Sequence, residues 1–96
     1  MNRLDEIMGR RLEIASIAER HNALGIAVFG SCARKEDDAT SDVDFLVDFN
    51  SEATLFDQIA IQLELTKLLG CKVDVVSRRG LAPSISDEVQ REAIAI

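Results

Sequence analysis

The segment Val43–Phe49, with the sequence VDFLVDF, constrains the fold of this chain most strongly. Successive side chains of a β-strand point to opposite faces, so this segment would place its valines and phenylalanines on one face and both of its aspartates on the other. The apolar face must then be covered by other parts of the chain. The pattern predicts a strand that packs on a core on one side and carries carboxylates on its other side.

The remaining elements follow from the spacing of apolar residues and from turn residues. Strands are expected at 25–29, 43–49 and 71–77, and helices at 3–20, at 54–69 and from residue 83 to near the C-terminus. Thr54 with Asp57 forms a capping box that starts the second helix, Gly70 ends it, and Ser84 with Asp87 caps the last helix. This order predicts an α/β (α+β) fold with a small, mixed three-stranded sheet flanked by helices.

Length and charge narrow the classes of function. The 96 residues are expected to form one domain, 1–96, since this length matches a single hydrophobic core. Apolar residues make up 47% of the chain, which is enough to build that core. The net charge of −6 argues against a broad nucleic-acid-binding surface, because such a surface needs clustered lysine and arginine.

No segment predicts a membrane span or a signal peptide. The longest stretch without a charged residue, His21–Ala33, is too short to cross a bilayer, and Asp5 and Glu6 interrupt the start of the chain. The cytoplasm is therefore the expected location. Cys32 and Cys71 are expected to be reduced and structural, since they form no CxxC pattern and the chain offers a single histidine for zinc.

Asp42 and Asp44 are the first candidate site residues. Two residues apart on a strand, their side chains point the same way, with Cα atoms about 6.5–7 Å apart. Carboxylates that share one location repel each other, so such a pair either takes up a proton or binds a cation. Mg²⁺ is a suitable cation, because it is commonly held by a few carboxylates together with substrate phosphates. The alternative is an acidic strand edge that faces water.

Asp74 is the third candidate, because it interrupts the apolar strand expected at 71–77. A charge in such a strand is costly unless it is paired or binds a metal. If this strand neighbours the one that carries Asp44, Asp74 completes a cluster of three carboxylates. The alternative is an ion pair with Lys72 or Arg78.

Gly30 and Ser31 follow the first strand and open a turn that could bind phosphate. A glycine lets the backbone approach a ligand closely, and exposed N–H groups together with the Ser31 hydroxyl would donate to phosphate oxygens. Arg34 could add a charged contact to phosphate or acceptor, or could pair with the acidic run 36–38. A glycine and a serine after a strand are also common in ordinary turns.

These residues together resemble a known signature. Residues 30–34 (GSCAR) and 41–47 (SDVDFLV), with ten residues between Ser31 and Asp42, are similar to the motif of the DNA polymerase β-type nucleotidyltransferase superfamily and especially of its minimal nucleotidyltransferases. The resemblance spans nearly the whole chain. One departure is Lys35, where many relatives carry glycine. It changes the loop and leaves the candidate metal ligands in place.

The resemblance implies a polymerase β-like fold and a Mg²⁺-dependent transfer of a nucleoside monophosphate from an NTP. It implies two ions, with Asp42 and Asp44 binding both and Asp74 binding the second and aiding deprotonation of the acceptor hydroxyl. Gly30 and Ser31 would hold the β- and γ-phosphates of the nucleotide.

The resemblance also implies an acceptor and a partner. Minimal nucleotidyltransferases are typically antitoxins encoded beside a HEPN-domain protein, which is a helical ribonuclease toxin. We therefore expect AMP transfer from ATP to a tyrosine hydroxyl of such a toxin. Two alternatives are a non-enzymatic antitoxin that neutralises its partner by binding, and a nucleotidyltransferase that acts on a small molecule.

The helix expected at 54–69 has two apolar stripes. Leu55, Phe56, Ile59 and Leu63 form one stripe, and Ile61, Leu65 and Leu68 form the other. A helix that is apolar on two sides is expected to be buried on two sides. Both stripes could pack within the domain, or one could contact a partner subunit in a hetero-oligomer.

Overall fold

The computed structural model describes residues 3–30, 32–33, 42–81 and 83–96, with the backbone alone for residues 83–86. Its helices are α1 (Arg3–Gly9), α2 (Arg11–Arg20), α3 (Leu55–Leu69) and α4 (Pro83–Glu92), with a short 3₁₀ turn, η1, at Arg78–Gly80. Its strands are β1 (Ala23–Phe29), β2 (Val43–Phe49), β3 (Val73–Ser77) and β4 (Ile94–Ala95). These elements confirm the expected α/β class.

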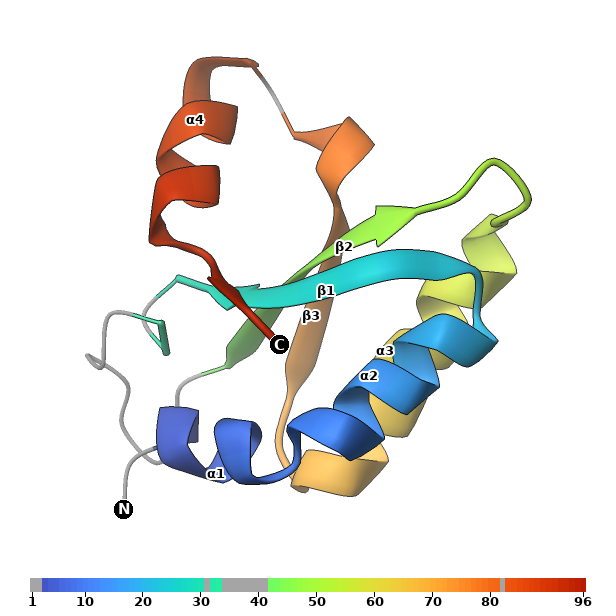
Figure 1. Cartoon of the computed structure of the whole chain (residues 1–96), viewed down its shortest axis with the longest axis vertical. Helices are drawn as coiled ribbons and strands as arrows, with labels where there is room; N and C mark the ends of the chain where they lie inside the picture. The colour runs from blue at the N-terminus through green and yellow to red at the C-terminus, as the bar shows by residue number, and fades with distance from the viewer. Residues whose placement is uncertain (1–2, 31, 34–41, 82) are drawn as a thin grey trace.

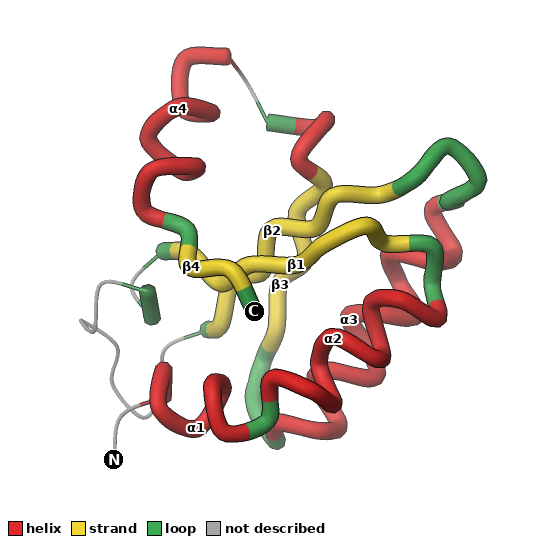
Figure 2. The backbone as a smooth tube through the Cα atoms, in the orientation of Figure 1, coloured by secondary structure: helices red, strands yellow, loops and turns green. Residues whose placement is uncertain are grey.

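The strands form one mixed sheet in the order β3-β2-β1-β4. Figure 2 shows these strands in yellow, with α1, α2 and α3 on one side of them and α4 on the other. β1 pairs antiparallel with both β2 and β4, whereas β2 pairs parallel with β3. Two parallel strands need a crossover connection, and α3 provides it between β2 and β3. The mixed sheet was expected with three strands, and β4 adds a fourth. A strand of two residues is too short to show the alternation by which a sequence predicts strands.

Helices α1, α2 and α3 cover one face of the sheet, and α4 lies on its other side (Figure 1). The alternation predicted for β2 is confirmed, because its valines and phenylalanines are all buried against the helices. Residues of the sheet and the helices that are almost completely buried in this core are Ile7, Ile14, Val28, Val43, Phe45, Val47, Ile61, Leu65 and Val73. The core therefore lies between the sheet and the first three helices.

The first helix differs from the single helix expected at 3–20. It is divided into α1 and α2 at Arg10, whose backbone leaves the helical conformation with φ −113° and ψ 17°. Gly9 precedes this break, and glycine stabilises a helix less than other residues except proline. The break turns the chain while Ile7 and Ile14 both remain buried in the core.

The ends of other elements also shift. β1 begins at Ala23, two residues before the expected start, and a register irregularity between Ala23 and Gly25 leaves Leu24 exposed. β3 begins at Val73, two residues later than expected. α4 begins at Pro83, so Ser84 lies inside the helix and not at its N-cap. Proline suits the first helical position because the amide hydrogen it lacks would have no partner there.

α3 begins and ends as expected but is buried on one side. Thr54 and Asp57 form the capping box, in which the backbone N–H of Thr54 donates to Asp57 Oδ2 at 2.8 Å, and Gly70 ends the helix in the left-handed conformation. Ile61 and Leu65 are fully buried. The expectation of burial on two sides is wrong within this chain, because the stripe of Leu55, Phe56, Ile59 and Leu63 is exposed.

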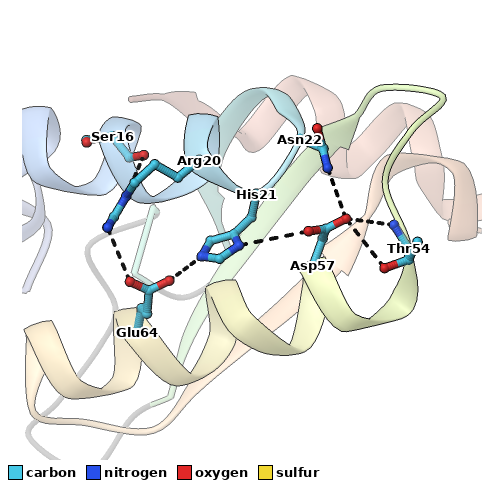
Figure 3. Close-up of polar contacts among 7 residues, drawn as sticks. All are labelled: Ser16, Arg20, His21, Asn22, Thr54, Asp57 and Glu64. Atoms are coloured by element: carbon cyan, nitrogen blue, oxygen red, sulfur yellow. Dashed lines mark hydrogen bonds and ion pairs between the residues drawn. The ribbon is translucent and has the colours of Figure 1, made fainter.

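A polar cluster joins the end of α2 to α3 (Figure 3). His21 lies between two carboxylates of α3, with its Nε2 on Glu64 and its Nδ1 3.9 Å from Asp57 Oδ1. Arg20 also pairs with Glu64, at 3.2 Å, and the Asn22 amide donates to Asp57 at 3.2 Å. The backbone N–H of Thr54 and then the Asn22 amide hold the pKa of Asp57 below its ordinary value. The cluster fixes α3 against the chain segment that leads into β1.

Two further expectations concern cysteines and membranes. Cys32 is buried and Cys71 is partly buried, and neither forms a disulfide in the described part of the chain. No helix in the described ranges is long and apolar enough to cross a membrane.

The two sides of α3 predict different effects of a leucine-to-alanine substitution on stability. Leu65→Ala removes a fully buried side chain and should lower the free energy of unfolding by about 2–5 kcal/mol. Leu63→Ala, one half-turn away and 65% exposed, should change it by less than about 0.5 kcal/mol. Urea denaturation followed by circular dichroism measures both. Equal losses for the two variants would contradict the placement of α3.

Candidate active site

Gly30 directly follows β1 and has a backbone conformation that favours glycine. Its φ is +75°, in the left-handed region that other residues rarely adopt. A Cβ added at this position would lie 2.8 Å from Asp44 Oδ2, which is closer than non-bonded atoms normally approach. Phe29, the preceding residue, pairs with Asp44 across the β1–β2 ladder. The Asp44 carboxylate therefore lies directly against the backbone of the turn that follows β1.

Asp44 and Asp74 face each other across two neighbouring strands. They are register partners in the parallel pair β2–β3, as Val43 and Val73 are just before them. Neighbouring strands lie about 4.8 Å apart, and aligned partners point to the same face. Because Val43 and Val73 are buried in the core, both aspartates lie on the opposite face, where each is partly exposed. The sheet register thus places these two carboxylates beside each other, as the sequence predicted.

Asp42 precedes β2 and stands two residues before Asp44. Its Oδ2 lies 3.5 Å from Nζ of Lys72, and both side chains are substantially exposed. The backbone explains this contact, since the N–H of Val43 donates to the Lys72 carbonyl at 3.0 Å. Lys72 was considered as a partner of Asp74 from the sequence, but the parallel register brings it to Asp42. Exposed ion pairs contribute little, so a stronger ligand can displace this one.

Asp74 has no ion pair among those found in the described part of the chain. Arg78, the other candidate partner, instead donates from Nη1 to Gln90 Oε1 of α4 at 3.0 Å. The alternative was that Asp74 forms a structural ion pair with Lys72 or Arg78. Among the described residues, neither of these two side chains pairs with Asp74.

The three carboxylates influence one another electrostatically. Partial burial raises the pKa of Asp44 above its ordinary value of 3.8, and the negative charges of Asp74 and then Asp42 raise it further. Desolvation and like charges both favour the protonated form of a carboxyl group. Asp44 is therefore the centre of the cluster, and a cation placed beside it would relieve the repulsion.

The donors of this cluster are of the type that Mg²⁺ prefers. Mg²⁺ takes oxygen ligands and is usually held by one or two carboxylates, water and substrate phosphates. Among the residues with described positions, no three His, Cys, Asp or Glu side chains converge closely enough to hold an ion by themselves. Asp44 with either neighbour supplies the two carboxylates that such a mixed coordination needs.

Two of the candidate nucleotide-binding residues, Ser31 and Arg34, lie outside the described residues, as do Lys35 and the acidic run 36–38. Cys32, which follows Ser31, is almost fully buried. The structure thus places one residue of the predicted phosphate-binding turn, Gly30, next to Asp44. The roles of Ser31 and Arg34 stay predictions.

The contact between Gly30 and Asp44 predicts a costly substitution. Gly30→Ala should lower the free energy of unfolding by about 1–3 kcal/mol, because alanine resists a positive φ, and it should also displace the Asp44 carboxylate. Gly25→Ala, within β1, is the matched control. Its φ is not positive and no atom lies within 4 Å of an added Cβ, so that variant should be neutral or slightly stabilised. A Gly30 variant as stable as the control would contradict this geometry.

The raised pKa of Asp44 predicts the pH dependence of stability in the absence of divalent cations. The folded state binds this proton more readily than the unfolded state, so stability is lost as pH rises from about 3.8 through the raised value. Asp44→Asn should remove this dependence and be more stable than the wild type at pH 7. Urea denaturation between pH 4 and pH 8 measures the difference, with Asp48→Asn at the other end of β2 as control. An Asp44→Asn variant that is less stable at pH 7 would show that a stabilising role of the charge outweighs the repulsion.

Comparison with known proteins identifies the family of this chain. Residues 13–96 match the family described as Polymerase beta, Nucleotidyltransferase. The chain is 39% identical to the protein adenylyltransferase MntA of Thermococcus cleftensis, over 83% of this chain and 81% of that protein. It is 34% identical to MJ0435 of Methanocaldococcus jannaschii, a candidate protein adenylyltransferase, over 88% of this chain and 90% of that one.

Solved structures show the same fold. A candidate minimal nucleotidyltransferase superimposes with a TM-score of 0.89 and 45% sequence identity, over 100% of this chain and 97% of that one. A toxin–antitoxin structure with AMP-PNP superimposes with a TM-score of 0.75 at 19% identity, over 88% of this chain and 69% of that one, which shows likeness of fold alone. By the family match over most of its length and by these relatives, the chain belongs to the polymerase β-type nucleotidyltransferases.

Proposed function

We propose that this chain is a protein adenylyltransferase that transfers AMP from ATP to a tyrosine hydroxyl of a HEPN-type ribonuclease toxin, and so acts as an antitoxin. The observation that carries the proposal is the pairing of Asp44 with Asp74 beside Gly30 in a chain that is 39% identical to an MntA adenylyltransferase. Likeness to the fold of a toxin–antitoxin structure with AMP-PNP is consistent with it. We also propose that residues 1–96 act as one nucleotidyltransferase domain, because α1 and α2 contribute to the same core as α3 and the sheet.

The proposed roles follow the positions of the carboxylates. Asp42 and Asp44 would hold two Mg²⁺ ions, and Asp74 would share the second. When bound, these ions would stabilise negative charge on the attacking and leaving oxygens. Binding of a cation would also offset the mutual repulsion that raises the pKa of Asp44. Asp42 would exchange its exposed contact with Lys72 for this stronger ligand.

The turn after β1 would position the nucleotide. The backbone at Gly30 has room for a close approach, because glycine carries no Cβ. We propose that Gly30 and Ser31 hold the β- and γ-phosphates, and that Arg34 binds phosphate. Such positioning supplies much of the rate enhancement in phosphoryl transfer.

In the proposed reaction the tyrosine oxygen attacks the α-phosphorus of ATP. A P–O bond to the tyrosine forms, the bond to the β-phosphate oxygen breaks, and pyrophosphate leaves. Asp74, at the outer side of the cluster on β3, would orient the tyrosine hydroxyl and accept its proton. The products are the adenylylated toxin, pyrophosphate and one proton.

The test uses the purified chain, its HEPN-domain neighbour, Mg²⁺ and ATP labelled at the α-phosphate. We expect label on the toxin, and the double variant Asp42→Asn with Asp44→Asn should reduce labelling by more than about 100-fold, since electrostatic stabilisation of this kind contributes factors of that order. Asp48→Asn is the matched control, because Asp48 lies on the same strand face but four residues from Asp44. That variant should retain labelling.

Other outcomes separate the alternatives. Inhibition of the ribonuclease without label would identify an antitoxin that acts by binding. Label on neither protein, with nucleotide transfer to an added small hydroxyl compound, would identify a small-molecule transferase. Undiminished labelling by the double variant would refute the proposed metal ligands, provided that circular dichroism shows the variant to be folded.

A further inference from the structure

Lys72 adds a positive charge to the three carboxylates of the site. Asp44 and Asp74 are register partners, and Asp42 and Lys72 each stand two residues before one of them. Side chains two residues apart in an extended chain point the same way, and neighbouring strands lie about 4.8 Å apart. The Lys72 ammonium contacts Asp42, with Nζ 3.5 Å from Oδ2. The four residues thus form the corners of one group, with three negative charges and one positive charge.

The backbone holds Lys72 in this place. The N–H of Val43 donates to the Lys72 carbonyl at 3.0 Å, and Val43 and Val73 are aligned and buried in the core. The Lys72 side chain itself is 71% exposed, and that of Asp42 is 40% exposed. A substitution of Lys72 should therefore change the charge at this corner and leave the fold intact.

An ammonium group on Asp42 competes with a divalent cation for the same carboxylate. The exposed ion pair is weak, so a divalent cation can displace it. A single and a double positive charge about 5 Å apart in water still repel each other enough to lower an affinity by roughly 10-fold. In the described ranges, no other basic side chain forms an ion pair with one of the three aspartates.

We propose that Lys72 is a tethered competitor of the metal ion at Asp42, and that it keeps the affinity of the site for free divalent cations low. This inference rests on the proposed function, because it takes the aspartates as Mg²⁺ ligands. Mg²⁺ is usually held by carboxylates and substrate phosphates together. A site that binds free Mg²⁺ weakly is therefore loaded mainly when a nucleotide adds its phosphate oxygens, and Lys72 acts on this loading through Asp42.

Binding of Mn²⁺ to the full chain in the absence of nucleotide tests the proposal. Mn²⁺ prefers the same oxygen ligands as Mg²⁺, and the electron paramagnetic resonance signal of the free ion decreases as the ion binds. Lys72→Gln should bind Mn²⁺ about 3- to 10-fold more tightly than the wild type, because the competing charge is absent. Lys72→Arg keeps the charge, so its affinity should stay within about 2-fold of the wild type.

Two controls separate this contact from the net charge of the chain. Lys67→Gln removes the same charge from an exposed lysine of α3, which covers the sheet face opposite the carboxylates (Figure 1). Its Mn²⁺ affinity should stay within about 2-fold of the wild type. In an Asp42→Asn background, Lys72→Gln should raise the affinity by less than about 2-fold, since the carboxylate for which the two cations compete is absent.

Thermal unfolding provides a second measurement. A bound cation stabilises the folded state, so addition of about 1 mM Mg²⁺ should raise the Tm of Lys72→Gln more than that of the wild type. Equal Mn²⁺ affinities of the wild type and Lys72→Gln would overturn the proposal, and so would an equal gain from Lys67→Gln.

Nucleotide transfer by the same proteins distinguishes this failure from failure of the proposed function. Equal affinities, together with transfer that is lost in the double variant Asp42→Asn with Asp44→Asn, would remove the role of Lys72 alone. Absence of Mn²⁺ binding by both the wild type and Lys72→Gln, together with undiminished transfer by the double variant, would overturn the role of Lys72 and the proposed metal ligands together.

Discussion

The parallel register of β2 and β3 is the constraint on which the rest of the structure depends. Val43 and Val73 are aligned and buried, and this alignment places Asp44 beside Asp74 on the opposite face. A slip of one residue would turn the aspartates into the core and the valines toward water, so hydrophobic burial holds the register. The acidic cluster is thus kept together by apolar contacts on the other side of the same two strands.

Bringing carboxylates together lowers the stability of the folded protein when no cation is bound between them. The pKa of Asp44 is raised by partial burial and by both of its acidic neighbours, which means that the ionised cluster is unfavourable at neutral pH. Functional sites commonly contain groups that reduce stability in this way. Here the apolar core beneath the cluster and the polar contacts of His21 with α3 stabilise the fold while the cluster remains ionised.

α3 links the site to the surface of the molecule. As the crossover between β2 and β3, it makes their parallel pairing possible, and its residues Ile61 and Leu65 complete the core under them. Its opposite side carries the exposed stripe around Phe56 and Leu63. One helix therefore completes the core beneath the site with one face and leaves the other face exposed, so substitutions on its two faces should affect stability to different extents.

The sequence by itself determined the strand VDFLVDF, the capping of α3 by Thr54, Asp57 and Gly70, and the three candidate carboxylates, because these depend on local spacing and on a few neighbouring residues. Only the tertiary structure decided the break at Arg10, the two-residue strand β4, the pairing of Lys72 with Asp42, and which stripe of α3 is buried. Each of these depends on residues that are distant in the chain, for example the Lys72 carbonyl that accepts from Val43. Local periodicity shows that a face is apolar, but only the packing of the other elements determines what covers it.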